Sequence, residues 1–293
     1  MARLYVVATP IGNLGDMSPR MREALETCDL IAAEDTRVTM KLLQVLSIHK
    51  PMISCHRHNE DERKSGIVER MLEEDLTVAL TCDAGTPGIS DPGEALVSEC
   101  WEAGIPVTPV SGPSAAATAL SVSGFNTREF AFYGFLPREG KPLREKLSSI
   151  AQSGIPVSVL YESPHRVTEL LLTIAKELPG ARVCVCCDLT KKFERIDRGN
   201  ADEIARRLQD MPNAEKGEYC VVLDTSLVET DEKPAPEADG ISTEMKLLQR
   251  MLEGSTLDEA ASGLREEGIK RNELYRARLK VSRFLESLPE AGA

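Results

Sequence analysis

The stretch TVALTCDAGTPGISDPGEALVSECWEAGIPVTPV, residues 77–110, decides the fold class of this chain. It begins with a short apolar run at 77–82 and continues through a loop rich in glycine and proline at 83–93. A helical pattern follows, and a second apolar run stands at 105–110. Short buried runs that alternate with helices are typical of parallel strands joined by crossover helices. This stretch therefore predicts an α/β unit.

The same pattern extends toward the N-terminus. Apolar runs at residues 4–8 and 29–33 read as two further buried strands, with room for helices between them. We therefore expect residues 1–124 to form a first α/β domain, in which helices flank a mainly parallel sheet.

Local signals mark two helix boundaries in this domain. Ser18-Pro19 and Asp91-Pro92 each look like an N-cap residue followed by proline at the first helical position. Gly104 stands where the second of these helices should end.

A second α/β domain is predicted over residues 125–224. It contains apolar or alternating runs that read as strands and segments with helical spacing between them. The predicted strands are residues 129–136, 156–162, 182–189, 193–199 and 218–224, and the predicted helices are 141–152, 165–177 and 200–209.

An acidic, proline-containing linker is predicted at residues 225–242, followed by a small helical module at 243–293. Basic residues crowd one segment of this module: Lys270, Arg271, Arg276, Arg278, Lys280 and Arg283. His165 and Arg166, at the start of a predicted helix, offer a second cationic contact for RNA phosphate or are only first-turn residues. The basic segment is either a solvated helix face or a nucleic-acid contact, and charge alone leaves both interpretations open.

The composition limits the possible functions. The formal net charge is −12, so an RNA substrate would need local basic patches or presentation by an assembly. Hydrophobic residues make up 42 %, which excludes a largely disordered chain. No run approaches the length of a membrane span, and the N-terminal strand pattern leaves no room for a signal peptide. We interpret the eight cysteines as reduced thiols of a cytoplasmic protein.

Four loops after predicted strands carry unusual sequences: TPIGNLGD (9–16), AEDTR (33–37), DAGTPGISDPG (83–93) and SGPSAA (111–116). Open parallel sheets bind ligands at the carboxyl ends of their strands, so these loops are the candidate site. They lack the G-x-G-x-x-G of dinucleotide sites and the G-x-x-x-x-G-K-[ST] of P-loops. Such loops suit a ligand held through ribose hydroxyls, an adenine edge and an amino-acid moiety, or they are merely tight turns.

Eight motifs follow in the order and spacing of one enzyme family: LYVVATPIGNLGD, LIAAEDTR, DAGTPGISDPG, GPSAAATALSVSG, GFLPR, YESPHR, LTKKFE and KGE. Over residues 4–224, and again at 246–281, the chain resembles the tetrapyrrole-methylase-like class of S-adenosylmethionine-dependent methyltransferases, in particular its members that methylate small-subunit ribosomal RNA. The resemblance implies two α/β domains with the cofactor in the cleft between them, a small C-terminal helical module, and a homodimer. It implies 2′-O-methylation of a cytidine ribose in 16S rRNA, within an assembled or nearly assembled 30S subunit.

The motifs also carry over site residues. The resemblance places the following residues around S-adenosylmethionine: Pro10, Asp83, Ala84, Gly85, Pro87, Ile89, Ser114, Ala115, Tyr161, Glu162, Leu189 and Gly217. It places the loop after the first strand near the acceptor.

Methyl transfer to a ribose hydroxyl needs alignment of the reactants, and a base or a charge-stabilising group would help because the hydroxyl is a weak acid. Glu34 and Asp35 are candidate proton acceptors. Arg37 and Lys191 are candidates to hold phosphate or stabilise a developing alkoxide. Each could instead be part of a structural ion pair, and the sequence does not single out one base.

Two cysteine and histidine patterns suggest metal chemistry but have simpler interpretations. His56, His58 and Glu60 lack further ligands at suitable spacing, and methyl transfer needs no metal, so we expect none. The C-x-x-C at residues 184–187 lies in an apolar strand pattern, which favours packing.

Two other functions stay open. A methylase of a tetrapyrrole or corrin would explain the glycine-rich loops but not the basic helical module. A ribosome-assembly factor without catalytic activity would retain the fold and need not bind S-adenosylmethionine.

Overall fold

The computed structural model describes residues 1–57, 59–228 and 242–267, and positions 269, 274, 277, 278, 280–282 and 284. The chain divides into two compact units, Met1–Thr230 and Asp231–Ala293. The first unit contains two five-stranded sheets with helices packed against them, which confirms the predicted α/β class.

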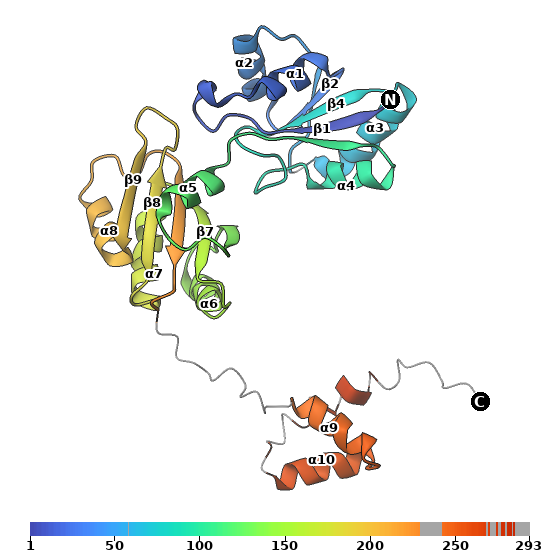
Figure 1. Ribbon diagram of the computed structural model, residues 1–293, viewed down its shortest axis with the longest axis vertical. Helices are drawn as coiled ribbons and strands as arrows, with labels where there is room; N and C mark the ends of the chain where they lie inside the picture. Colours follow the sequence, from blue (N-terminus) through green and yellow to red (C-terminus); the bar gives the residue numbers. More distant parts are fainter. Residues whose placement is uncertain are drawn as a thin grey trace. The chain divides into compact units, whose positions relative to one another are not determined.

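The first sheet is wholly parallel (Figure 1). Its strand order is β3-β2-β4-β1-β5, from β1 (Arg3–Val7), β2 (Leu30–Ala33), β3 (Met52–Ser54), β4 (Thr77–Thr81) and β5 (Val107–Val110). Because the strands are parallel, the loops after β1, β2 and β4 meet at one edge. Strand β3 was not predicted, since it has only three half-buried residues, preceded by a proline.

Helices pack on both faces of this sheet, which explains why the inner strands β2 and β4 are largely apolar and buried. On one face, α1 (Pro19–Thr27) and α2 (Thr36–Leu46) pack through residues such as Leu25 and Leu43. On the other, α3 (Glu60–Glu73) and α4 (Glu94–Glu102) pack through Met71 and Leu96. A short 3-10 helix, η1 (Leu14–Asp16), lies in the loop after β1.

The helix boundaries were predicted correctly in one case and wrongly in another. Ser18 caps α1, its side chain accepting from the amide of Met21 at 3.1 Å, and proline follows it. The Asp91-Pro92 prediction was wrong, because α4 begins at Glu94 after Gly93 (φ 132°). A local side chain does not cap α4, and a residue of α3 does so instead, as described below.

The second sheet is mixed, with order β6-β7-β10-β8-β9. It comprises β6 (Ala131–Phe135), β7 (Val157–Glu162), β8 (Arg182–Cys187), β9 (Arg195–Asn200) and β10 (Tyr219–Asp224). Only β6 and β7 are parallel among its pairs. All five strands were predicted, to within two residues at their ends.

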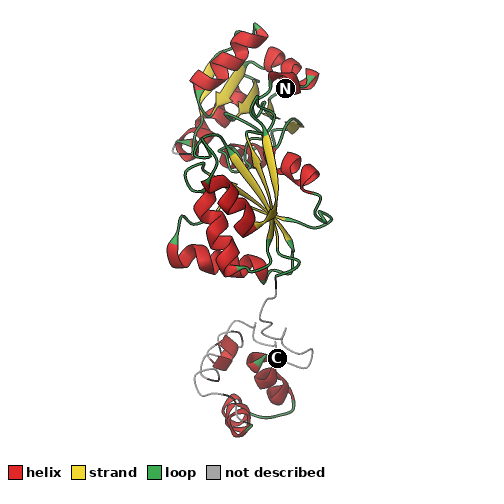
Figure 2. Cartoon of the chain, turned by 90° about the vertical axis from the view of Figure 1, so that its left-hand side faces the viewer, coloured by secondary structure: helices red, strands yellow, loops and turns green. Residues whose placement is uncertain are grey.

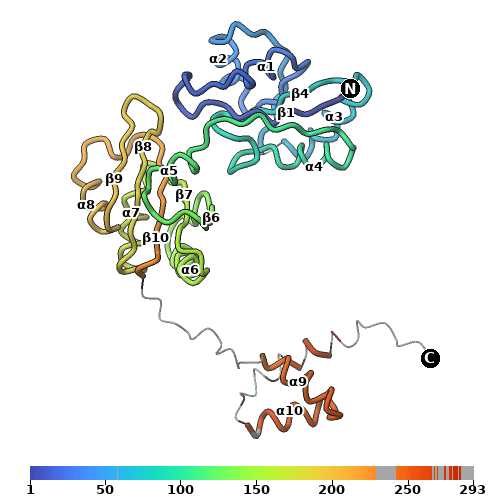
Figure 3. The backbone as a smooth tube through the Cα atoms, in the orientation of Figure 1, coloured from blue at the N-terminus to red at the C-terminus, as the bar shows by residue number. Residues whose placement is uncertain are grey.

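Helices lie on both sides of the second sheet as well (Figure 2). One face is covered by α6 (Gly140–Ala151), α7 (Val167–Glu177) and α8 (Ala201–Gln209). The other carries α5 (Ala115–Ser123), through which the chain passes from the first sheet to the second (Figure 3). Helix α7 begins two residues later than predicted, after a turn in which Ser163 accepts from the amide of Val167.

The second unit contains α9 (Thr243–Leu252) and α10 (Leu257–Glu266), and the described residues between 274 and 284 are also helical. Leu247, Ala260 and Leu264 form a small apolar core with Leu274 and Val281. Thr256 and Glu259 form a reciprocal capping box at the start of α10.

All eight cysteines of the chain are free and buried. Cys184, Cys186 and Cys220 pack under α5, consistent with their interpretation as apolar core residues.

Candidate active site

A cavity of about 330 Å³ lies where the carboxyl-end loops of the first sheet face the second sheet. The first half of the wall comes from the loops after β1 and β4, and the second from α5, β6, β7, the loop after β8 and the start of β10. Its lining is Ile11, Ala84, Gly85, Thr86, Ile89, Ser90, Asp91, Ser114, Ala115, Phe135, Tyr161, Glu162, Ser163, Pro164, Leu189, Gly217, Glu218, Tyr219 and Cys220.

Backbone hydrogen bonds fix the two loops of the first half to each other. The amide of Thr9 donates to the carbonyl of Gly85 at 2.8 Å, and the Gly85 amide donates back to Thr9 at 3.1 Å. The Thr9 hydroxyl also donates to the Cys82 carbonyl at 3.2 Å. Gly85 has φ +90°, a conformation that glycine adopts without strain. The peptide of this residue is therefore presented to the cavity as a rigid surface.

Aromatic rings and a buried carboxylate form the opposite wall. Tyr161 packs edge-on against Phe132 and Phe135, with ring centroids 5.1 and 5.9 Å away, and burial raises the pKa of its hydroxyl to about 12. Glu162 is buried and accepts from the Ser163 amide at 2.7 Å and from the Arg166 guanidinium at 2.8 Å. The orientation of Glu162 is thus set before any ligand binds.

Gly217 lies in the wall at a position where a residue with a side chain would not fit. A Cβ at this position would lie 2.9 Å from both Asp188 Oδ2 and Cys187 Sγ, and its φ is +95°. The Glu218 carbonyl accepts from the Asp188 amide at 2.9 Å, which joins the loop after β8 to the start of β10.

Most of the residues predicted to bind the cofactor lie on the wall of this cavity: Ala84, Gly85, Ile89, Ser114, Ala115, Tyr161, Glu162, Leu189 and Gly217. Pro10 and Asp83 line a neighbouring cavity of about 270 Å³ between the loop after β1 and α2. Pro87 is buried and lines neither of these two cavities. The cofactor contact itself stays a prediction for all of them.

Four carboxylates, those of Glu34, Asp35, Asp83 and Asp91, gather near the edge where β2 and β4 end. The Asp83 amide donates to Glu34 Oε2 at 3.2 Å, and the Asp35 amide donates to Asp83 Oδ1 at 3.2 Å. Burial raises the pKa values of Glu34, Asp83 and Asp91, and each is raised further by the charge of a neighbouring carboxylate. The positive charge of Arg57 partly offsets the rise in pKa at Glu34 and Asp91. The neighbouring carboxylates and burial thus raise the pKa of Glu34, which suits Glu34 to the role of proton acceptor.

Asp35 and Arg37 have a structural role in this arrangement. The Asp35 side chain caps α2 by accepting from the Arg37 amide at 2.8 Å, and it also binds the Arg37 guanidinium. These hydrogen bonds lower the pKa of Asp35 to about 2, which makes it a weak base. Of the two predicted proton acceptors, Glu34 is therefore the better candidate.

Lys191 joins the two halves of the first unit. Its Nζ lies 3.3 Å from Asp188 and 3.1 Å from Glu218, and these partners raise its pKa although burial opposes them. Its aliphatic stem packs against Gly12 of the loop after β1, where a Cβ would lie 2.4 Å from Lys191 Cγ. Both ends of this side chain are thus engaged within the protein.

The residues predicted to contact RNA belong to both units of the chain. His165 is exposed, whereas Arg166 pairs with buried Glu162. In the second unit, Arg278 pairs with Asp258 and Lys280 with Glu244. Lys270, Arg271, Arg276 and Arg283 lie outside the described residues.

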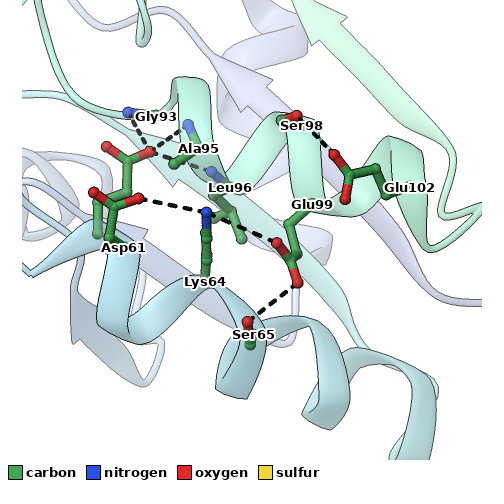
Figure 4. A network of polar contacts seen from close by, with 10 residues as sticks. Asp61, Lys64, Ser65, Gly93, Ala95, Leu96, Ser98, Glu99 and Glu102 are labelled. Carbon is green, nitrogen blue, oxygen red and sulfur yellow. Dashed lines mark hydrogen bonds and ion pairs between the residues drawn. The ribbon is translucent and has the colours of Figure 1, made fainter.

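Glu60 has a role that the sequence analysis missed. Its carboxylate oxygen Oε1 accepts from the amides of Gly93 at 2.9 Å, Ala95 at 2.9 Å and Leu96 at 3.2 Å. In Figure 4, the dashed lines from the labelled Gly93, Ala95 and Leu96 meet at one carboxylate group. It thereby supplies the cap that α4 lacks locally and ties the end of the loop at residues 83–93 to α3. Among the described residues, no grouping of three or more metal-ligating side chains occurs; His58 lies outside that part of the chain.

Asp91, Arg57 and Phe135 were also missed. Asp91 belongs to the candidate loop at 83–93 but was interpreted individually only as a helix cap. Arg57 belongs to the segment CHRHNE (55–60), for which a place at the substrate mouth was one interpretation, but only its neighbours His56, His58 and Glu60 were considered individually, as metal ligands. Phe135 belongs to a predicted strand, but alternation alone does not show which aromatic residue of that strand faces a cavity.

The first unit has the fold of the tetrapyrrole methyltransferases. Uroporphyrin-III C-methyltransferase from Thermus thermophilus, crystallised with S-adenosylhomocysteine, superimposes with a TM-score of 0.52 at 16 % identity, over 76 % of this chain and 97 % of that one. The methyltransferase CobJ superimposes with a TM-score of 0.56 at 16 % identity, over 77 % and 95 % of the two chains.

Sequence comparison is more specific. A ribosomal RNA small subunit methyltransferase I from Synechocystis is 41 % identical over 96 % of this chain and 99 % of its own length. Another, from Escherichia coli O157:H7, is 39 % identical over 95 % of both chains. The profile of the Tetrapyrrole (Corrin/Porphyrin) Methylases matches residues 3–205. The chain belongs to the tetrapyrrole methylase family and, within it, to the family of ribosomal RNA small subunit methyltransferase I.

Within the described part of the chain, every helix is too short or too polar to cross a membrane.

Proposed function

We propose that this chain is an S-adenosylmethionine-dependent methyltransferase that methylates the 2′-oxygen of a cytidine ribose in 16S rRNA of the small ribosomal subunit. The observation that carries the proposal is a cavity at the carboxyl ends of the first sheet, walled by the motifs of this family. Relatives named as ribosomal RNA small subunit methyltransferase I match nearly the whole chain, the helical module included, which favours ribosomal RNA over a tetrapyrrole as substrate.

The cavity residues fit S-adenosylmethionine. Ile11, Ile89 and Leu189 provide apolar surface for an adenine ring, and the backbone around Gly85 can approach a ligand closely. Asp91 provides a carboxylate for ribose hydroxyls or an ammonium group. The cofactor would supply an activated methyl group on a sulfonium.

The chain's own residues would hold the acceptor in line and accept its proton. Alignment of two reactants is worth roughly 7–11 kcal/mol in favourable systems, so the rigid loops can contribute much of the rate. A general base contributes roughly 10²–10⁴-fold more. We assign that role to Glu34, because its carboxylate lies at the same sheet edge and burial raises its pKa.

The remaining assignments are also proposals. Residues 1–124 and 125–224 would act as the two domains that enclose the cofactor, and residues 243–293, joined by the linker at 225–242, as the contact to the subunit. The protein would act in the cytoplasm as a homodimer.

Two measurements test the proposal. Isothermal titration calorimetry with S-adenosylhomocysteine should show binding in the micromolar range, and absence of binding would favour an assembly factor without catalytic activity. Labelled methyl groups should be transferred to 30S particles in preference to free 16S rRNA. Transfer to a porphyrinoid and not to 30S particles would show that the tetrapyrrole alternative is correct.

A further inference from the structure

A third cavity, of about 480 Å³, adjoins the proposed cofactor cavity. The two share Ser90 and Phe135 in their linings, so they meet at these residues. Glu34, Arg57 and Tyr133 are among the other residues that line it. By contrast, the cavity that contains Pro10 shares no lining residue with the proposed cofactor cavity. An acceptor oxygen must reach the methyl group, and of these two cavities only the one lined by Glu34 meets the proposed cofactor cavity.

The chemistry of this adjoining cavity suits a nucleotide. The Arg57 guanidinium donates to the Ser90 carbonyl at 2.8 Å, which positions it on the wall and leaves further N–H groups for a phosphate. Phe135 is 61 % exposed, a large value for a phenylalanine, and its ring packs edge-on against Tyr161. Tyr133 is less available for stacking, because the Lys146 ammonium lies 4.3 Å from its ring centroid.

The backbone at Gly134 allows strand β6 and the loop after β4 to approach each other closely. Gly134, between the two aromatic residues, has φ +59°, and a Cβ there would lie 2.9 Å from Ser90 Oγ. Strand β6 can therefore come directly against the loop that carries Ser90, at the place where the two cavities join.

We propose that the cavity bounded by Glu34, Arg57 and Phe135 holds the target nucleotide, with its base stacked on Phe135 and a phosphate on Arg57. The ribose then lies between them, with its 2′-hydroxyl toward Ser90 and the proposed cofactor cavity. Glu34 accepts the proton of that hydroxyl as the oxygen–methyl bond forms and the sulfur–methyl bond breaks, which leaves a neutral thioether. This assignment rests on the proposed function and adds the acceptor site to it.

The test compares substitutions in this cavity with one in the neighbouring cavity. Phe135→Leu keeps an apolar contact to Tyr161 but removes the flat ring, and Arg57→Gln removes the charge. We expect each to raise the KM for 30S particles about tenfold, in line with the contribution of one stacked base or one phosphate contact. Affinity of the Arg57→Gln variant for S-adenosylhomocysteine should change less than about twofold, because Arg57 lines the adjoining cavity and not the proposed cofactor cavity. Lys41→Ala, which alters the cavity near Pro10, should leave both values unchanged.

Glu34→Gln provides an independent readout. We expect it to lower kcat about a hundredfold with KM for 30S particles retained, and to remove the acidic limb of the pH–rate profile. The inference is overturned if Phe135→Leu and Arg57→Gln keep the wild-type KM, or if Lys41→Ala is the variant that loses affinity for 30S particles. If the wild-type enzyme binds S-adenosylhomocysteine but methylates no 30S particle, the proposed function fails, and the acceptor site fails with it.

Discussion

Replacement of Glu60 by alanine should loosen the loop at residues 83–93 and the start of α4 together. One carboxylate oxygen accepts from three amides, of which those of Gly93 and Leu96 are buried. Each buried donor left without an acceptor costs about 1–3 kcal/mol, so we expect Glu60→Ala to lower the free energy of unfolding by roughly 3–5 kcal/mol. That is a large part of the roughly 5–15 kcal/mol of a typical domain.

The chain has a local probe for this change. Its only tryptophan, Trp101, lies in α4, so urea unfolding followed by tryptophan fluorescence reports on the helix that Glu60 caps. Glu60→Gln keeps a carbonyl oxygen in the same place and should lose only about 1 kcal/mol. Hydrogen exchange should show faster exchange of the Gly93, Ala95 and Leu96 amides in Glu60→Ala.

Glu102→Ala is the matched control, because this carboxylate lies on the same helix but, among the described residues, binds only the Ser98 hydroxyl, at 3.4 Å (Figure 4). It should change the unfolding free energy by less than about 0.5 kcal/mol. An unfolding midpoint for Glu60→Ala equal to that of Glu102→Ala, with the three amides still protected, would refute the role of Glu60 as the cap.

Three further outcomes are expected. Gly93→Ala should destabilise the first unit by about 2 kcal/mol in urea unfolding, because residue 93 has φ 132° and the new Cβ would lie 2.9 Å from Leu80 Cδ2. An unchanged free energy of unfolding would contradict this strain. Burial raises the pKa of Asp91, so its protonated form is favoured in the folded state and stability is lost as pH rises through the folded pKa. Asp91→Asn should therefore raise the unfolding midpoint more at about pH 8 than at about pH 4 in thermal denaturation, and the opposite order would show that the charge is stabilising. Removal of residues 226–293 should leave the affinity for S-adenosylhomocysteine unchanged. It should weaken binding to 30S particles about tenfold in a sedimentation assay, and unchanged binding would remove the helical module from the proposal.

Much of the fold could be predicted from local pattern. Most strands of the two sheets are short apolar runs, and the cap at Ser18 is a local signal that needs no tertiary information. Strand β3 could not be found this way, because three half-buried residues do not make a pattern. The start of α4 was wrong for a different reason, since its cap comes from Glu60, 33 residues before Gly93.

The loops of the site could be predicted from the sequence, but the contacts between their residues could not. Motifs locate the loops, but the register of β2 with β4 brings Glu34 beside Asp83, 49 residues later, and strand order was not part of the sequence prediction. The pairing of Arg166 with Glu162 at four-residue spacing could have been recognised locally. The exposure of Phe135 could not, because it depends on which face of β6 meets the loop that carries Ser90.

The burial of every cysteine has a practical consequence. Burial raises the pKa of Cys55 and of Cys220 to about 12, so their reactive thiolate is scarce at neutral pH, and the side chains are also shielded from reagents. A maleimide dye added to the folded chain should therefore attach almost exclusively to a cysteine introduced on the surface. Spectroscopic labels can then be placed on either unit of the native sequence, without first stripping it of thiols, to measure how the helical module approaches the ribosome.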